Sequence, residues 1–252
     1  MDTGRTCYLF LDFDGTVCQD GGVAPQTRKA LETVQRAGHR LILSTGRSRG
    51  GAPEDVGIRW DGVLYGGADY TYLGERQLLY RMDRAEGEAW FRSAMERRFW
   101  ITVECDRRNK RFGFDRCEKP LTDAEKEAYL AEYRALVADQ VLTKLSVGAP
   151  CVENEPTEQI RVVDQLRYLE LFPKGTDKGV LLREFCSRYG IEKAQTIAFG
   201  DSCNDLAAFR ETELSVSMRG APSVLAELAT YRAKTEFGVA EGIRHYFSAL
   251  FS

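Results

Sequence analysis

Residues 10–17 read Phe10-Leu11-Asp12-Phe13-Asp14-Gly15-Thr16-Val17, and this stretch decides how the rest of the chain is organised. The run from Tyr8 to Leu11 is apolar and has no polar face, which is typical of a buried parallel strand. Asp12 and Asp14 follow that strand directly. Because open α/β folds place their active sites at the carboxyl ends of parallel strands, the stretch predicts a site built on these two carboxylates.

The Asp pair also has two simpler interpretations. A calcium-binding loop has an oxygen ligand at every second position, a Gly at its centre and a Glu at its end. Gly15 instead follows Asp14 directly, and a buried strand precedes the pair, so the calcium loop does not fit. A plain Asp-Gly turn does fit, and the octapeptide alone does not decide between a turn and a site.

The composition of the 252 residues is that of an ordinary globular protein, with 43% hydrophobic residues, 29% charged residues and a formal net charge of −3. This length permits one large domain or two moderate ones. A nearly neutral chain argues against nucleic-acid binding through the overall field. No apolar run approaches the ~18 residues of a membrane span, and the N-terminal apolar stretch carries two aspartates, unlike a secretory signal. We expect a cytoplasmic protein with neither a membrane nor a nucleic-acid partner, and leave its oligomeric state open.

The metal-ligating residue types narrow the choice of cofactor. The seven cysteines are odd in number and contain no C-x-x-C pair, which argues against a disulfide framework or a zinc site. With only two histidines, a metal site has to use oxygen ligands, and this favours Mg2+.

Strand and helix patterns alternate in both halves of the chain. The alternating elements are predicted at Pro25–Gly38, Arg40–Ser44, Gly62–Tyr65, Lys178–Tyr189, Thr196–Phe199 and Leu214–Met218, before a C-terminal helix. This rhythm predicts an α/β fold with a doubly wound parallel sheet. We assign residues 1–67 and 174–252 to this core.

Residues 68–173 are predicted to form an inserted α+β domain. Its elements are a hairpin at Tyr70–Met82, helices at Arg84–Arg98 and after the capping box Thr122–Glu125, and strands at Trp100–Cys105, Arg111–Asp115, Val141–Val147 and Arg167–Phe172. Residues 140–165 give the weakest pattern in the chain. The basic run 107–111 is interpreted as a solvated hairpin tip rather than a nucleic-acid-binding patch. A third interpretation is a basic rim of the inserted domain that attracts anionic substrates.

Polar clusters follow three of the predicted parallel strands and should meet at one edge of the sheet. They are Asp12 with Asp14, Thr45 with Gly46, and Asp201 with Asn204 and Asp205, while Lys178 opens the helix after the insertion. Several carboxylates at one edge are unfavourable unless a cation joins them, and Mg2+ prefers such oxygen ligands. Phosphoryl transfer uses this set of groups, because positive charge has to screen a carboxylate that attacks a phosphate.

The same segments resemble the motifs of the haloacid dehalogenase (HAD) superfamily, and within it the Cof-type sugar-phosphatase group, also called subfamily IIB. In chain order, the four matching motifs are Asp12-Phe13-Asp14-Gly15-Thr16, Thr45-Gly46-Arg47, Lys178-Gly179 and Gly200-Asp201 through Asn204-Asp205. The segment Gly66-Gly67-Ala68 is similar to the group's Asn-Gly-Ala, with Gly replacing Asn. The match covers both halves of the core, whereas the insertion agrees mainly in size and position. The resemblance implies a Rossmann-like core with a large inserted cap domain.

The resemblance also implies a role for each motif residue. Asp12 would be the nucleophile and Asp14 the general acid/base. Mg2+ would be held by Asp12, the backbone carbonyl of Asp14 and Asp201, with Asp205 orienting the metal shell. The phosphate- and substrate-binding residues would be Thr45, Gly46, Arg47 and Asn204, and the charge-neutralising lysine would be Lys178. Ser44 and Lys174 are the neighbouring alternatives to Thr45 and Lys178.

The expected function is that of a Mg2+-dependent phosphatase that hydrolyses small phosphorylated metabolites, sugar phosphates first, through an aspartyl-phosphate intermediate. A phosphomutase with the same core and cap type, and a noncatalytic phosphate-binding module, are the alternatives. A phosphorylated receiver domain does not fit, because its loops do not accommodate an insertion of ~100 residues. Asp69 is a further candidate substrate contact, and Cys203 is interpreted as a small residue in a tight loop rather than a redox switch.

Overall fold

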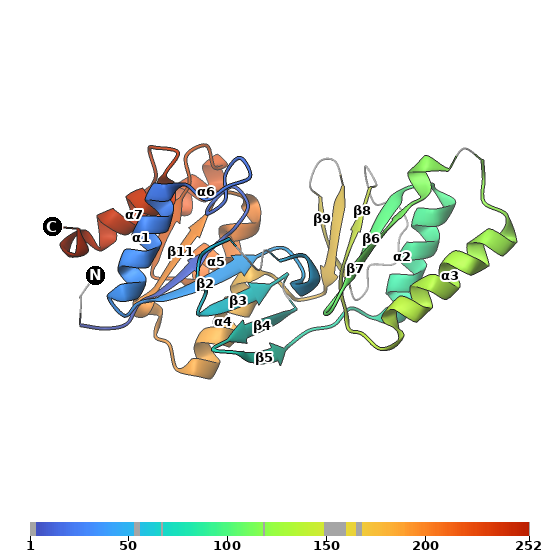
Figure 1. Ribbon diagram of the computed structural model, residues 1–252, viewed down its shortest axis with the longest axis horizontal. Helices are drawn as coiled ribbons and strands as arrows, with labels where there is room; N and C mark the ends of the chain where they lie inside the picture. Colours follow the sequence, from blue (N-terminus) through green and yellow to red (C-terminus); the bar gives the residue numbers. More distant parts are fainter. Residues whose placement is uncertain are drawn as a thin grey trace.

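The computed structural model describes residues 4–52, 56–66, 68–117, 119–148, 160–164 and 168–251. Two β-sheets, each with its own helices, lie side by side along the longest axis of the molecule (Figure 1). The larger sheet has eight strands and the smaller has five. The carboxyl ends of the parallel strands in the larger sheet point toward the smaller one (Figure 1).

The larger sheet is parallel apart from one hairpin at its edge. Its strands run in the order β13-β12-β11-β1-β2-β3-β4-β5, and β4 and β5 are the antiparallel pair. The strand bounds are β1 Tyr8–Leu11, β2 Arg40–Thr45, β3 Gly62–Tyr65, β4 Asp69–Tyr72, β5 Glu75–Leu78, β11 Thr196–Gly200, β12 Leu214–Ser217 and β13 Tyr231–Arg232. From the central strand β1, the strands β2 to β5 follow one another toward one edge of the sheet, and β11 to β13 follow toward the other edge. This arrangement confirms the predicted doubly wound α/β fold.

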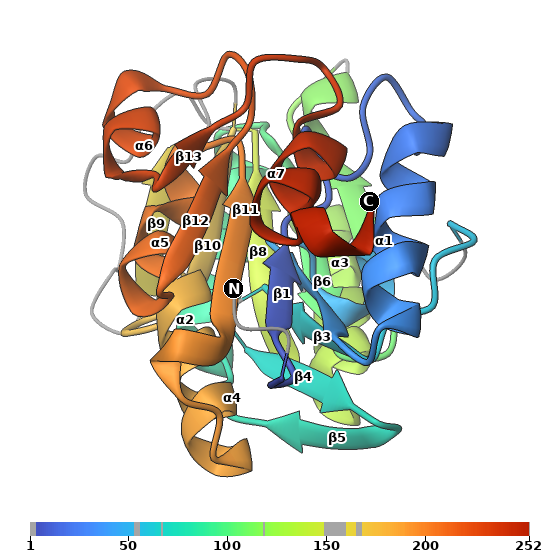
Figure 2. The same ribbon diagram turned by 90° about the vertical axis from the view of Figure 1, so that its left-hand side faces the viewer.

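Helices cover both faces of the larger sheet, because its central strands are apolar on both sides. They are α1 Pro25–Arg36 and α7 Gly238–Tyr246 on one face, and α4 Lys178–Tyr189, α5 Leu206–Glu211 and α6 Ser223–Leu228 on the other (Figure 2). Leu9 and Leu11 of β1 belong to the apolar cluster beneath α1 and α7. Phe10, between them in sequence, packs instead against Phe185 of α4, with ring centroids 5.9 Å apart.

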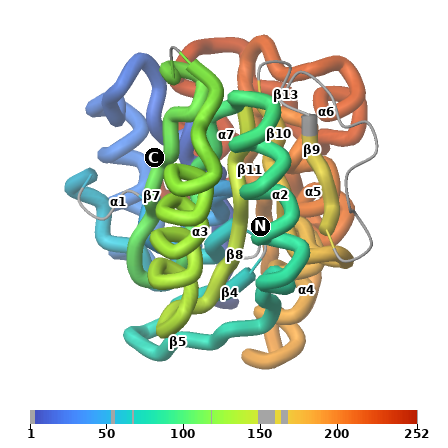
Figure 3. Tube along the Cα trace, turned by 90° about the vertical axis from the view of Figure 1, so that its right-hand side faces the viewer, coloured from blue at the N-terminus to red at the C-terminus, as the bar shows by residue number. Residues whose placement is uncertain are grey.

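The smaller sheet is antiparallel in the order β7-β6-β8-β10-β9 and has helices on one face only (Figures 1 and 3). Its elements are α2 Arg84–Glu96, β6 Trp100–Cys105, β7 Asn109–Gly113, α3 Asp123–Ala138, β8 Leu142–Val147, β9 Ile160–Asp164 and β10 Leu169–Pro173. Ile101, Val103 and Leu145 pack in one apolar cluster with residues of α2 and α3. The alternate residues of these strands point to the opposite face, toward the larger sheet.

The hairpin of β4 and β5 differs from the sequence prediction, which places it in the insertion that starts at residue 68. It pairs with β3 and extends the larger sheet. The physical reason is the burial of Tyr70 and Tyr72 against Phe185, with ring centroids 5.3 and 5.0 Å from the phenylalanine. The smaller sheet begins only with β6, after α2.

The other differences concern the ends of elements, two strands that the sequence does not predict, β9 and β13, and two short helices that it does not predict, α5 and α6. The sequence predicts no strand at β9, which lies within the stretch that has the weakest pattern. The capping box before α3 is confirmed, because Thr122 and Glu125 bond each other's backbone amides. Gly67 and Arg167, named in the predictions, lie outside the described residues.

An ion-pair cluster ties α2 to α3 and predicts an acid-sensitive contact. Glu88 of α2 accepts hydrogen bonds from Arg134 of α3 at 2.6 Å and from Arg92 at 2.8 Å. The bonds from Arg134, followed by those from Arg92, lower the pKa of Glu88 to about 2 against the opposing effect of burial. Glu88→Gln should therefore lower the free energy of unfolding by about 1 kcal/mol at pH 7, measured by urea unfolding.

The sign of the pH dependence follows from the lowered pKa. A carboxylate with a depressed pKa stabilises the fold above its unfolded value of about 4.3, and this stabilisation is lost as the pH falls toward about 2. The difference between wild type and Glu88→Gln should therefore shrink between pH 5 and pH 2. Glu96→Gln, an exposed change on the same helix, is the control. A difference that does not change with pH would contradict the assignment.

Candidate active site

The predicted site residues lie at the carboxyl ends of three neighbouring strands. Asp12 follows β1, Thr45 ends β2 and Asp201 follows β11, and β1 pairs with both other strands. Lys178 is the first residue of α4, and the side chain of Asp177 caps this helix by accepting from the Val180 amide at 2.8 Å. The alternation of strands and helices therefore brings these distant segments to one edge of the sheet.

Three carboxylates and one ammonium group form the centre of the site. Oxygen atoms of Asp12, Asp201 and Asp205 all lie within 4.8 Å of one another. Lys178 Nζ donates to Asp12 Oδ1 at 2.5 Å and to Asp205 Oδ1 at 2.6 Å. All the side chains of this bridge are buried, so the lysine neutralises two carboxylates in a region of low dielectric constant.

Burial controls the protonation of this centre. Loss of hydration raises the pKa of Asp12 to about 7, against the lowering effect of Lys178 and with a further raising effect of Asp205. Burial acts to lower the pKa of Lys178, but Asp12 and Asp205 outweigh it and raise that pKa above its ordinary value. Burial and Asp205 also raise the pKa of Asp201. One lysine therefore does not balance the negative charge, and further positive charge is favourable here.

Asp205 shapes the loop that follows β11. Its Oδ2 accepts hydrogen bonds from the backbone amides of Asp201 at 3.0 Å and Ser202 at 3.1 Å. Thr16, in the loop after β1, donates from its hydroxyl to Asp201 Oδ1 at 3.4 Å. Asp201 is thus oriented from both loops, and the polar residues predicted at these strand ends do converge.

Gly15 is required where the loop after β1 passes Asp201. Its φ of +81° is unfavourable for any residue with a Cβ, and a Cβ placed there would lie 2.2 Å from Asp201 Oδ2. Gly15→Ala should therefore displace the Asp201 carboxylate and lower kcat/KM at least about tenfold, while unfolding free energy falls by roughly 1–3 kcal/mol.

Gly21→Ala is the matched control for that change. Gly21 has the same φ of +81°, but nothing lies within 4 Å of the position that its Cβ would take. It should lose a similar amount of stability and keep its activity. Equal activity losses in the two variants, measured by steady-state kinetics, would show that backbone strain rather than contact with Asp201 is responsible.

Asp14 is held by Arg47 on the open side of the centre. Arg47 forms a bidentate ion pair with it, from Nε to Oδ2 at 2.8 Å and from the second guanidinium nitrogen to Oδ1 at 2.6 Å. These bonds raise the pKa of Arg47. The Asp14 carboxylate is more than half exposed and is not part of the cluster of three carboxylates. The structure thus brings Arg47 to the site but pairs it with the predicted acid/base.

Thr45, Gly46 and Asn204 line a small cavity of about 40 Å3 together with Lys178. The Thr45 hydroxyl accepts the Arg47 backbone amide at 3.1 Å, which fixes the turn after β2. Thr45 rather than its neighbour Ser44 is among the residues that line this cavity. Lys174, the alternative to Lys178, is exposed and lines a separate cavity.

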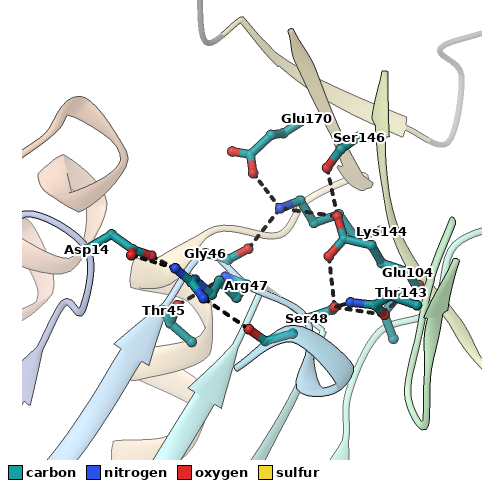
Figure 4. Close-up of polar contacts among 12 residues, drawn as sticks. Asp14, Thr45, Gly46, Arg47, Ser48, Glu104, Thr143, Lys144, Ser146 and Glu170 are labelled. Atoms are coloured by element: carbon teal, nitrogen blue, oxygen red, sulfur yellow. Dashed lines mark hydrogen bonds and ion pairs between the residues drawn. The ribbon is translucent and has the colours of Figure 1, made fainter. Parts of the chain in front are cut away.

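A larger cavity of about 520 Å3 separates these residues from the smaller sheet. Asp12, Asp14, Arg47 and Asp201 line one side of it. The opposite side is formed by Asn109, Tyr168 and five residues of β6, β8 and β10. These five, here called the polar wall, are Thr102, Glu104, Lys144, Ser146 and Glu170. Figure 4 shows four residues of this wall, Glu104, Lys144, Ser146 and Glu170, on the side opposite Asp14.

The polar wall is the part of the site that the motifs do not identify. Polar residues alternate with apolar ones in these strands, as Thr102 and Glu104 do in β6, but this alternation is equally typical of a solvated sheet face and does not by itself identify a site. The structure also gives the positions of Asp69 and Cys203, which the sequence analysis singled out. Asp69 is buried between Arg49 at 2.9 Å and Arg76 at 3.0 Å, away from the residues that line the cavity. Cys203 is exposed in the loop after β11.

Comparison with known families gives a match that spans most of the chain. The model of the haloacid dehalogenase-like hydrolase family matches residues 9–54 and 121–243. The 5-amino-6-(5-phospho-D-ribitylamino)uracil phosphatase YcsE of Bacillus subtilis is 24% identical to this chain over 258 residues, or 94% of each protein. The putative phosphatase YkrA of the same organism is 24% identical and covers 94% of this chain and 96% of its own length.

Solved structures share the fold over nearly the whole length. The sugar phosphatase BT4131, described as HAD subclass IIB, superposes with a TM-score of 0.77 at 18% identity, covering 96% of this chain and 99% of its own. None of the helices within the described ranges combines the length and the apolar character of a membrane span. The matched regions contain all four predicted motifs, so the resemblance and the enzyme class that it implies are confirmed, and the chain belongs to the haloacid dehalogenase-like hydrolase family.

Proposed function

We propose that this enzyme is a Mg2+-dependent phosphatase that hydrolyses small phosphorylated metabolites through an aspartyl phosphate on Asp12. The observation that carries the proposal is the Asp12–Lys178–Asp205 bridge, which buries a carboxylate beside an ammonium group at the edge of a polar cavity. A carboxylate held in this way is oriented by the lysine, and its charge is screened from an incoming phosphate.

The chemistry of the donor set fits a hard divalent cation. Three carboxylates lie within 4.8 Å of one another, and among the described residues the Lys178 ammonium group is the cation that bonds them. Mg2+ prefers such oxygen ligands. Asp12, Asp201 and the backbone carbonyl of Asp14 would hold the ion, with Asp205 orienting them. When bound, it would supply positive charge that screens the phosphate from the attacking carboxylate.

The residues of this chain then divide the reaction into two steps. Asp12 attacks phosphorus, the bond between phosphorus and the ester oxygen breaks, and Asp14 gives its proton to that oxygen. Water then attacks the aspartyl phosphate while Asp14 takes up a proton, and the bond between phosphorus and Asp12 breaks to release phosphate. Arg47 exchanges Asp14 for a phosphate oxygen when the substrate arrives, which frees the acid/base for its role. Lys178 holds Asp12 throughout.

We also propose that the two sheets correspond to a catalytic core and a cap. The core would comprise the larger sheet, including the hairpin of β4 and β5, and the cap would comprise the segment from α2 to β10. The cap presents its polar face to the catalytic residues and would exclude water when it closes.

Sugar phosphates are the leading substrate class. The names of two matched proteins specify a sugar phosphatase and a phosphatase for a phosphorylated ribityl compound, both with hydroxyl-rich leaving groups. The polar wall supports the same class for this chain, because hydroxyl groups can bond its carboxylate and hydroxyl oxygens.

The test is phosphate release from a panel of sugar phosphates, nucleotides and phosphorylated cofactors, with Mg2+ and with EDTA. We expect release that requires Mg2+ and is fastest for hydroxyl-rich monophosphates. A protein that binds phosphorylated ligands without releasing phosphate would favour the noncatalytic module. Phosphate release that is equally fast with Mg2+ and with EDTA would contradict the metal-binding role proposed for the carboxylate cluster.

A further inference from the structure

The three charged residues of the polar wall, Glu104, Lys144 and Glu170, pair with one another. Lys144 lies opposite Glu104 in the register of β6 and β8, and its Nζ is 3.6 Å from Glu104 Oε1. The same Nζ contacts Glu170 Oε1 and donates to the carbonyl oxygen of Gly46, in the loop after β2, at 3.2 Å. Burial acts to lower the pKa of Lys144, but the two glutamates outweigh it and raise that pKa. One protonated lysine therefore stands between two carboxylates.

Glu104 is held from both sheets. Its Oε2 accepts the hydroxyl of Ser48, in the loop after β2, at 2.8 Å, and its Oε1 accepts the hydroxyl of Ser146 at 2.7 Å (Figure 4). These two hydrogen bonds and the ion pair with Lys144 fix the position of the Glu104 carboxylate at the cavity. Two glutamates and one lysine give the charged residues of the wall a formal charge of −1, and Arg161 on β9 acts electrostatically on Glu170 from outside the wall.

Both cations that line the larger cavity, within the described part of the chain, are already bound by carboxylates. Lys144 contacts the two glutamates of the wall, and Arg47 is bidentate to Asp14. Of these two cations, Arg47 is the one proposed to exchange its carboxylate for an oxygen of the transferred phosphoryl group, while Lys144 stays paired with the glutamates. A second anionic group on the substrate would compete for Lys144 and face the charges of Glu104 and Glu170.

We infer that the polar wall acts as a charge filter for the leaving group. It accepts monophosphates whose leaving groups carry hydroxyl or amino groups, and it rejects those with a second phosphate or a carboxylate. Like charges in a partly dry cavity repel strongly, whereas hydroxyl and ammonium groups donate to carboxylates. The inference rests on the proposed function and names Glu104, Lys144 and Glu170 as its specificity determinants.

Arg161 shows where the smaller sheet does place positive charge. It lies on β9 opposite Phe172 of β10, with its guanidinium carbon 4.8 Å from the centre of that ring. It lines the small cavity with Thr45 and Lys178, and Glu170 lines both this cavity and the larger one. The positive charge of Arg161 is thus beside the wall rather than among the residues that line the larger cavity.

The test compares substrates that share one phosphorylated carbon and carry leaving groups of different charge. The four substrates are a hexose 6-phosphate, the corresponding hexosamine 6-phosphate, the hexose 1,6-bisphosphate and the 6-phosphoaldonate. Wild type should show kcat/KM values at least about tenfold higher for the first two than for the last two. The readout is the ratio of kcat/KM for the first two substrates to kcat/KM for the last two, because partial unfolding of a variant lowers all these values by the same factor.

Glu170→Gln removes one negative charge from the wall while keeping the shape of the side chain. It should reduce the preference for the hexose 6-phosphate over the bisphosphate by about five- to tenfold. Glu132→Gln is the matched control, because Glu132 lies on α3, pairs with Lys110 and lines a different cavity. This control should leave the ratio unchanged.

The outcomes separate the filter from the proposed function. Equal kcat/KM for the monophosphate and the bisphosphate in wild type would overturn the filter and leave the phosphatase intact. If wild type prefers the monophosphate and Glu170→Gln shows the same ratio of kcat/KM values, the polar wall is not the source of the preference. No phosphate release from any substrate would overturn the proposed function itself.

Discussion

Lys178→Met should abolish turnover and lower the free energy of unfolding by about 3–5 kcal/mol at pH 8 in the absence of Mg2+. The reason is that Lys178 is the buried partner of both Asp12 and Asp205, at 2.5 and 2.6 Å. Without the ammonium group, two carboxylates are left buried beside each other with no counter-charge. Urea unfolding and steady-state phosphate release measure the two effects.

The loss of stability in Lys178→Met should depend on pH. Burial already raises the pKa of Asp12 to about 7, and removal of the lysine takes away a lowering effect, so that pKa rises further. A carboxylate with a raised pKa stabilises the fold in its protonated form, fully below its unfolded pKa of about 3.9, and this stabilisation is lost as the pH rises through the folded value. The defect should therefore shrink at pH 5.

Lys178→Arg controls for the positive charge. It keeps the charge with a different shape, so it should recover much of the stability and little of the activity. A Lys178→Met protein as stable as wild type at pH 8 would contradict the charge balance described for this centre.

Asp12→Asn should reduce phosphate release by a factor on the order of 10^3 to 10^5 while leaving the protein folded. The amide cannot form the proposed phosphoryl intermediate, and it fills the same space. Because burial of the Asp12 carboxylate is unfavourable, as its raised pKa shows, the variant should be no less stable than wild type at pH 8. Phosphate release and urea unfolding are measured in parallel.

Mass spectrometry of the acid-quenched enzyme adds a readout that does not depend on turnover. Wild type mixed with its best substrate should show a mass increase of one phosphoryl group on the peptide that contains Asp12, and Asp12→Asn should not. Asp14→Asn is the matched control, because it changes the neighbouring carboxylate and keeps the nucleophile. Turnover by Asp12→Asn within tenfold of wild type would sink the proposed mechanism.

The sequence predicts the larger sheet and the catalytic centre well, for a physical reason. Buried parallel strands are short apolar runs, and each site residue stands directly after one of them or at the start of the next helix. The order of elements then determines that Asp12, Thr45, Asp201 and Lys178 meet, and the structure brings them together. Local patterns suffice when the geometry follows from strand direction.

The hairpin of β4 and β5 and the polar wall depend on contacts that local patterns do not contain. The sequence of the hairpin is compatible with either sheet, and the packing of Tyr70 and Tyr72 on Phe185 places it in the larger one. Glu104 and Lys144 look like ordinary residues on the solvated face of a strand. Only the arrangement of the two sheets shows that this face borders the catalytic cavity.

The position of β1 between β2 and β11 has a consequence for folding during synthesis. Lys178 stands 166 positions after Asp12, and β11 follows later still. The elements of the smaller sheet, from α2 to β10, are consecutive, so they can pair while the ribosome is still adding the C-terminal part. Until β11 is made, one edge of β1 has no partner and offers free amides and carbonyls to other nascent chains. Chaperone dependence should therefore be greatest for chains that end between β10 and β11.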